Sequence, residues 1–102
     1  MTTFDDREAA FESKFVHDAE TQFRLEARAN KKIALWAADI MGKSAADALA
    51  YVAEVIRADM QESGAEDVIA KVAADLGARS TAAAIREKYA AFLVEAQQEM
   101  MQ

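Results

Sequence analysis

The chain contains no cysteine and no proline, and only three glycines among its 102 residues. Without cysteine, no disulfide bond, thiolate nucleophile or cysteine-ligated metal site can form. Proline and glycine punctuate most turns between strands, so their scarcity disfavours a sheet-rich fold. Alanine, the strongest helix former, is used heavily instead. The composition therefore favours an all-α protein, and a chain of this length is expected to build one modest core.

Long apolar runs and catalytic motifs are also missing. No run approaches the roughly 18 apolar residues that a membrane-spanning helix needs, and no apolar leader opens the chain. There is no glycine-rich phosphate loop and no nucleophile motif. His17 is the only histidine, without a second ligand at a metal-binding spacing. We therefore expect no enzyme activity, no catalytic residue, no metal, no cofactor and no direct insertion into a membrane.

The net charge of −6 argues against nucleic acid as a partner, because phosphate binding requires a basic surface. Charge is distributed unevenly: residues 1–20 carry −4, residues 21–32 carry +3, and the remainder carries −5. The basic segment contains Arg24, Arg28, Lys31 and Lys32. The simplest interpretation is a solvated helix face, on which Glu20 and Arg24 form an ordinary i, i+4 ion pair.

Apolar residues recur at helical spacing in four segments separated by the glycines. The expected boundary residues are, in chain order, Gly42, Ser44, Ser63 with Glu66, Gly77, and Ser80 or Thr81. The apolar stripes expected to face the core are Leu25, Ala29, Ile33, Trp36 and Ile40; then Ala45, Leu49, Val52, Ile56 and Met60; then Val68, Ile69, Val72 and Leu76; then Ile85, Tyr89, Phe92, Ala96 and Met100. Four helices with short connections predict an antiparallel four-helix bundle.

The first helix is too long for such a bundle. A helix over residues 4–41 would span about 57 Å, whereas the second and fourth helices would span about 30 Å. Its first part carries a separate stripe of Phe4, Phe11, Phe15, Ala19 and Phe23, with no obvious segment of the chain to cover it.

The energy balance favours an N-terminal segment that is unfolded in the free protein. Burying each phenylalanine is worth roughly 1.5–3 kcal/mol, whereas fixing about 15 backbone residues costs on the order of 15–30 kcal/mol. We therefore predict two parts: residues 1–18 form an arm, flexible or overhanging in the free protein and helical on binding, and residues 19–102 form the bundle. A first helix that folds back on the bundle, or that dimerises, is the alternative.

Several segments of the first 40 residues form a specific pattern: Thr2 to Glu8, Ala10 to Glu12, Lys14-Phe15, His17-Asp18, Phe23 to Asn30 and Leu35 to Ala38. This pattern closely resembles the ATPase inhibitor subunit zeta family of alphaproteobacterial F-type ATP synthases. The acidic turn at Glu66-Asp67-Val68 and the pair Asp75-Leu76 extend the resemblance along the chain.

The resemblance implies a protein inhibitor of F1-ATPase. In that family the N-terminal segment enters a catalytic α/β interface, becomes helical and reaches towards the γ stalk, which blocks rotation in the direction of ATP hydrolysis. The implied partners are the α, β and γ subunits, and the implied location is cytoplasmic, peripheral to the inner membrane through the F1 head. The free protein is expected to be a monomer.

The residues expected to contact the partner all lie in the arm. They comprise the apolar anchors Phe4, Phe11 and Phe15 and the polar residues Asp5, Asp6, Arg7, Glu8, Glu12 and Lys14. Two other functions stay open: a non-inhibitory helical assembly or structural subunit of the same complex, and a nucleotide-responsive regulator.

Overall fold

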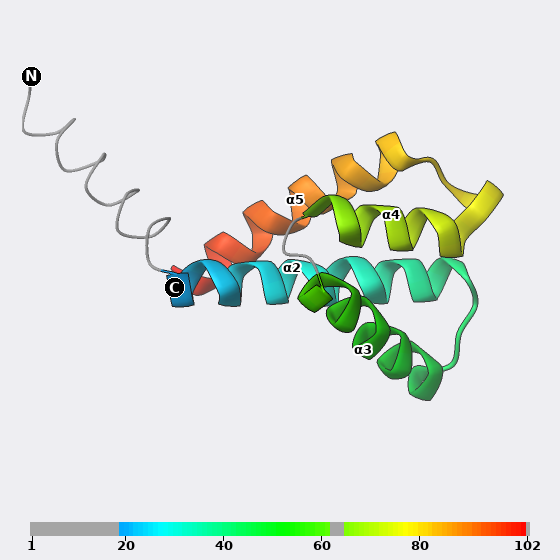
Figure 1. Ribbon diagram of the computed structural model, residues 1–102, viewed down its shortest axis with the longest axis horizontal. Helices are drawn as coiled ribbons and strands as arrows, with labels where there is room; N and C mark the ends of the chain where they lie inside the picture. The colour runs from blue at the N-terminus through cyan, green and yellow to red at the C-terminus, as the bar shows by residue number, and fades with distance from the viewer. Residues whose placement is uncertain (1–18, 62–64, 102) are drawn as a thin grey trace, which may run out of the picture.

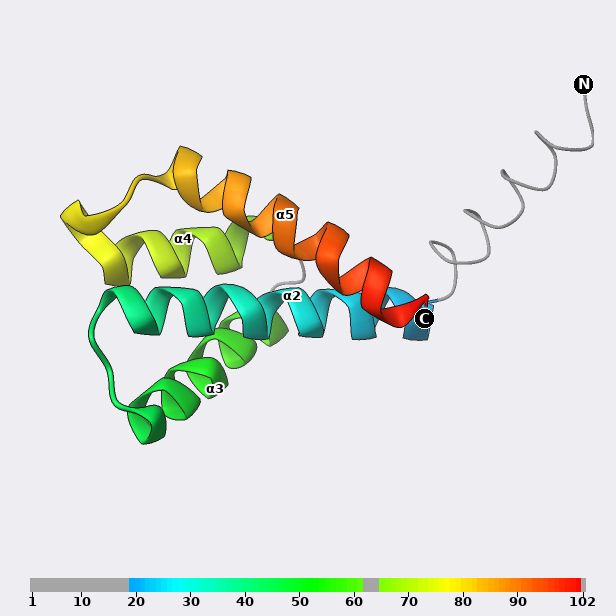
Figure 2. The ribbon, with the colours of Figure 1, turned by 180° about the vertical axis from the view of Figure 1, so that it is seen from behind.

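The computed structural model describes residues 19–61 and 65–101. They form the helices α2 (Ala19–Ile40), α3 (Ala45–Gln61), α4 (Ala65–Leu76) and α5 (Ala82–Met100), with a short 3-10 helix, η1 (Gly77–Arg79), before α5. In both views of the ribbon, α2 lies between α3 on one side and α4 with α5 on the other (Figure 1, Figure 2). The described residues contain no strand, and the predicted all-α, four-helix architecture is confirmed. The part of the first helix predicted over residues 4–18 lies outside the described residues.

The C-terminus of α2 ends at a glycine, as the sequence predicts. Gly42 adopts a left-handed conformation with φ of 72°, which a residue without a Cβ enters at little cost. The Gly42 N–H donates to the Asp39 carbonyl and the Lys43 N–H donates to the Ala38 carbonyl, both at 3.0 Å. This pair of hydrogen bonds is a Schellman motif, which satisfies the last carbonyls of the helix and turns the chain towards α3.

Two hydroxyl side chains cap the helices that follow. The Oγ of Ser44 accepts from the Asp47 N–H at 3.2 Å before α3, and the Oγ1 of Thr81 accepts from the Ala84 N–H at 3.1 Å before α5. Both helix starts are therefore confirmed, with Thr81 rather than Ser80 as the cap of α5. The predicted cap of α4 at Ser63 lies outside the described residues.

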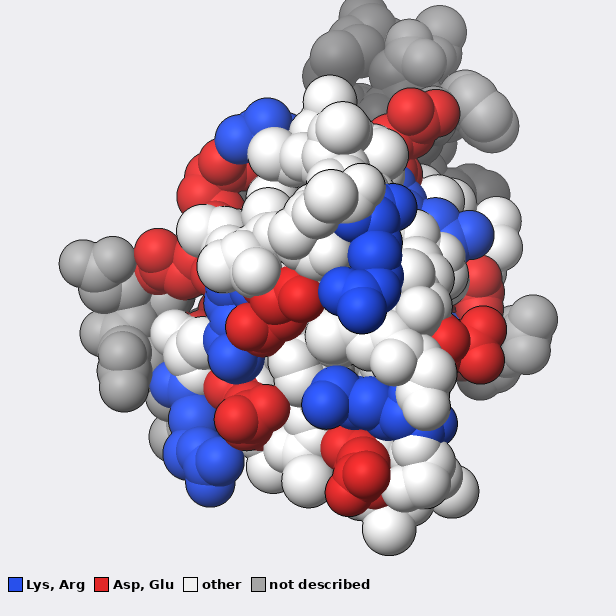
Figure 3. Space-filling model, turned by 90° about the vertical axis from the view of Figure 1, so that its right-hand side faces the viewer, with Lys and Arg blue, Asp and Glu red and all other residues white. Residues whose placement is uncertain are grey.

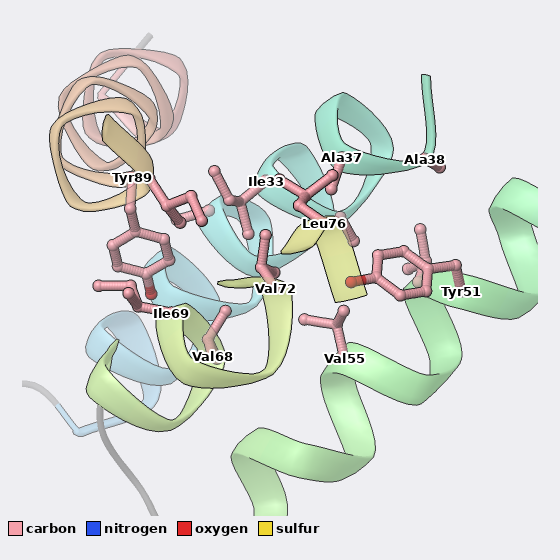
Figure 4. Packing of buried hydrophobic residues seen from close by; sticks show 14 residues of the cluster. Ile33, Ala37, Ala38, Tyr51, Val55, Val68, Ile69, Val72, Leu76 and Tyr89 are labelled. Carbon is pink, nitrogen blue, oxygen red and sulfur yellow. The ribbon is translucent and has the colours of Figure 1, made fainter. Parts of the chain in front are cut away.

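The core gathers side chains from all four helices (Figure 4). Its fully covered members include Ile33 of α2, Val55 of α3, Leu76 of α4 and Ile85 of α5. The predicted stripe of α4 is confirmed throughout, because Val68, Ile69, Val72 and Leu76 are all buried. In α5 the predicted residues Ile85, Tyr89 and Ala96 are buried, while Phe92 and Met100 are half-buried.

The predicted core face of α3 is wrong. Of its members only Val52 is buried: Ala45, Leu49 and Ile56 are exposed, and the side chain of Met60 lies outside the described residues. The helix instead turns Tyr51 and Val55 inward. Alanines give α3 apolar character on several faces, so periodicity alone does not select one.

A hydrogen bond made by Tyr51 favours the observed inward face of α3. Tyr51 donates from its hydroxyl to Asp75 Oδ2 at 2.9 Å, and Lys71 donates to the same oxygen at 3.0 Å. Burial first, and then the bond to Asp75, raises the pKa of Tyr51. Rotating α3 to bury Leu49 would break this link between α3 and α4.

The predicted core stripe of α2 is correct except at its end. Ala29 and Ile33 are fully buried and Trp36 packs against the edge of the core. Ile40, which we predicted as core, is 37% exposed. The core face advances by four residues, from Ile33 to Ala37 to Met41, so position 40 rotates towards solvent.

Candidate protein-docking site

Every residue predicted to contact a partner lies outside the part of the chain that the structure describes. These residues are Phe4, Asp5, Asp6, Arg7, Glu8, Phe11, Glu12, Lys14 and Phe15. What the structure describes is the arm base, defined here as residues 19–28 of α2 with residues 95–101 of α5. In both ribbon views the end of α5 lies beside the start of α2, whereas α3 and α4 stop short of it (Figure 1, Figure 2).

Of the phenylalanines in the predicted stripe, Phe23 lies within the described residues. Its side chain is 64% exposed. It precedes Asn30 and Ala37 by seven and fourteen residues, so the three share one face of α2. Asn30 and Ala37 are buried in the core. The core-facing side of α2 thus continues past the ends of α3 and α4, and the Phe23 ring there is largely exposed.

One buried polar contact joins α2 and α5 inside the bundle. The Tyr89 hydroxyl donates to Asn30 Oδ1 at 2.8 Å, and both side chains are buried. Burial first, and then the negative charges of Glu26 and Asp59, raises the pKa of Tyr89.

Ion pairs join α2 and α5 in the arm base and one turn beyond it. Arg28 contacts Glu99 at 3.2 Å, and Lys32 contacts Glu95 and Glu99 at 2.8 Å each. The hydrogen bonds that Lys32 donates to Glu95 and Glu99 raise the pKa of Lys32, and the bond from Lys32 lowers the pKa of Glu99. We call these four residues the α2/α5 ion-pair cluster. The cluster joins α2 to α5 through side chains that are partly exposed.

The basic segment is therefore only partly the solvated face that we predicted. Arg24 does pair with Glu20 one turn away, at 2.6 Å. Arg28 and Lys32 instead pair across to α5, which the sequence analysis missed. A signal was present: Glu95 and Glu99 are four residues apart on the last helix, and so are Arg28 and Lys32 on the first.

An open groove of about 480 Å³ runs beside the ion-pair cluster. Its lining adds Lys31 and Leu35 to Arg28, Lys32 and Glu99. Leu35 is 38% exposed, so the groove combines an aliphatic patch with both signs of charge. At the opposite end of the bundle, basic and acidic side chains are interspersed over the surface without a field of one sign (Figure 3).

The exposed and charged side chains of the arm base are better suited to contact with a protein than to binding a metal ion. Within residues 19–61 and 65–101, no cluster of three or more His, Cys, Asp or Glu side chains has the geometry to hold a metal ion. Over the same ranges, no helix combines the length and apolar character needed to cross a bilayer. His17 lies outside the described residues. The exposed ring and the flanking charges at the arm base are chemically suited to a protein surface.

Comparison with known proteins identifies the family. A family model described as ATPase inhibitor subunit zeta matches residues 1–99. The chain belongs to the ATPase inhibitor subunit zeta family. The match spans both the arm and nearly all of the bundle, so the resemblance inferred from the first 40 residues is confirmed for the chain as a whole. Membership of this family assigns the protein a role as an ATPase inhibitor that acts on ATP synthase.

The four-helix architecture of this zeta-family protein also occurs in a solved structure. A protein structure determined by solution NMR is 45% identical in sequence and superimposes with a TM-score of 0.70. The alignment covers 78% of this chain and 94% of that chain. No curated protein sequence matches the chain.

Proposed function

We propose that this zeta-family protein inhibits ATP hydrolysis by inserting residues 1–18, as a helix, into a catalytic α/β interface of F1 beside the γ stalk. The observation that carries the proposal is the family match, which begins at residue 1 and so includes the whole arm. The exposure of Phe23 supports it, because the phenylalanine stripe is uncovered where the described chain begins. The protein would sit on the cytoplasmic side of the inner membrane, attached through the F1 head.

The proposed mechanism requires no bond chemistry from the inhibitor. Phe4, Phe11 and Phe15 would enter apolar pockets of the α and β subunits, and their burial offsets the entropy lost when the arm becomes helical. The acidic and basic residues between them would pair with the charged walls of the interface. A helix wedged between subunits that must open and close blocks rotation sterically, and asymmetric closure around it would favour inhibition of hydrolysis over synthesis.

In this proposal the bundle stays outside F1 as an anchor. Its core is complete within the described residues, with no buried side-chain polar atom there left unsatisfied. It can therefore fold before docking, and only the arm needs to order on binding. Amide order parameters of the free protein test this division: low values over residues 4–16 are expected, and values as high as those of α2 would contradict it.

Titration of purified F1 with the full chain tests the proposed activity. ATP hydrolysis should fall to a low plateau with increasing protein. Phe11→Ala and Phe15→Ala should each weaken inhibition by about 1–4 kcal/mol if the ring is an anchor. Binding to F1 without loss of hydrolysis would instead assign the chain as a non-inhibitory structural subunit, and unchanged inhibition by both variants would remove these rings from the interface.

A further inference from the structure

We propose that the docking surface for F1 extends beyond the arm into α2, where Phe23 makes an apolar contact with the partner. This inference rests on the proposed function and adds to it a contact residue on the folded bundle. The partner surface it fits is an apolar pocket at the mouth of the cleft that receives the arm.

The Phe23 ring is largely left out of the packing among the described residues. The side chain is 64% exposed although it stands on a regular stretch of α2, well within the helix that begins at Ala19. The backbone around it is supported by the Glu20–Arg24 ion pair and by the Gln22–Glu26 hydrogen bond. The ring is thus presented on a formed helix. Covering it on binding costs only side-chain ordering, whereas each contact of a folding arm also costs backbone ordering.

The geometry of the arm base places the ring next to the proposed interface. Phe23 lies five positions after residue 18, which is about 8 Å along a helix. A cleft that holds the arm up to residue 18 therefore brings its rim within contact distance of this part of α2. Because α3 and α4 stop short of this end, neither stands between Phe23 and an approaching subunit (Figure 1, Figure 2).

The chain offers a matched control in Leu49. Its side chain is 63% exposed, which nearly equals the exposure of Phe23, and it also lies on a helix. It stands near the start of α3, whose neighbour in the fold is the end of α2 rather than its beginning (Figure 1). An effect of general surface hydrophobicity would appear at both positions, whereas a docking contact would appear only at Phe23.

The experiment compares Phe23→Ala, Phe23→Leu and Leu49→Ala in the full chain. Thermal unfolding should be nearly unchanged in all three, because both positions are exposed. The concentration of half-maximal inhibition of F1 should rise roughly 5- to 50-fold for Phe23→Ala and less than twofold for Leu49→Ala. Phe23→Leu, which keeps an apolar side chain, should recover most of the lost inhibition.

Binding to immobilised F1, measured in parallel, separates this inference from the proposed function. If the wild-type chain binds without inhibiting, the proposed function fails, but weaker binding confined to Phe23→Ala still supports the extended surface. Phe23→Ala that binds and inhibits within twofold of wild type overturns the inference. An equal loss with Leu49→Ala also overturns it, because the effect would then not be specific to the arm base.

Discussion

At the scale of single residues, the buried pair Asn30 and Tyr89 shows what the sequence pattern could and could not supply. Tyr89 lies on the predicted stripe of α5 and is buried as expected. Asn30 belongs to no apolar stripe, yet it is 1% exposed because Tyr89 provides its hydrogen-bond partner. A hydrogen bond of this kind requires that the two residues lie side by side on neighbouring helices. The spacing of residues within one helix does not predict this.

This pair gives a stability prediction. Asn30→Ala leaves the Tyr89 hydroxyl buried without its partner, and Tyr89→Phe does the same to Asn30, so each variant should lose about 1–3 kcal/mol of the free energy of unfolding. The double variant should lose less than the sum, because neither group is then left unpaired. Urea denaturation measures all three. Strict additivity would show that the hydrogen bond does not couple the two helices.

At the scale of helices, boundaries were more predictable than faces. Gly42, Ser44 and Thr81 act through local backbone geometry, and their roles as stop and start residues follow from their chemistry. The inward face of α3 was predicted wrongly because alanine lets a helix pack on several sides. The choice was made by the bond between Tyr51 and Asp75, which links residues far apart in sequence. The α2/α5 ion-pair cluster escaped prediction for the same reason.

The α2/α5 ion-pair cluster predicts a specific response to acid. The hydrogen bond from Lys32 lowers the pKa of Glu99 below its ordinary value of 4.5 in the folded protein. A carboxylate with a depressed folded-state pKa stabilises the fold above its unfolded-state pKa, and that contribution is lost as the pH falls through the folded-state pKa. Glu99→Gln should therefore be less stable than wild type at pH 6, and the difference should shrink as the pH falls below 4.5.

Thermal unfolding of both proteins across this pH range measures the effect. Glu66→Gln is the matched control, because Arg86 likewise lowers the pKa of Glu66 in an ion pair between α4 and α5. It should show the same pH dependence of stability. Only Glu99→Gln should speed amide hydrogen exchange in residues 20–28 of α2. Faster exchange there in both variants, or in neither, would show that the cluster does not hold the arm base.

At the scale of the whole molecule, the predicted division into a bundle and an arm rests on helix length and on expected burial together. Four apolar stripes and three glycines were enough to predict four helices, and the structure confirms them. The predicted excess length of the first helix, with phenylalanines that no other segment was expected to cover, indicated a partner. The identity of that partner came from similarity of residues to a family. Periodicity cannot specify it, because the partner's surface is not encoded in this chain.

The central claim is that the arm inhibits and the bundle anchors. The most direct test is ATP hydrolysis by F1 in the presence of the full chain or of a chain that lacks residues 2–15, with thermal unfolding of both measured alongside. The account predicts that the full chain inhibits, that the shortened chain does not, and that the bundle unfolds at nearly the same temperature in each. A shortened chain that inhibits as well as the full chain would contradict the account.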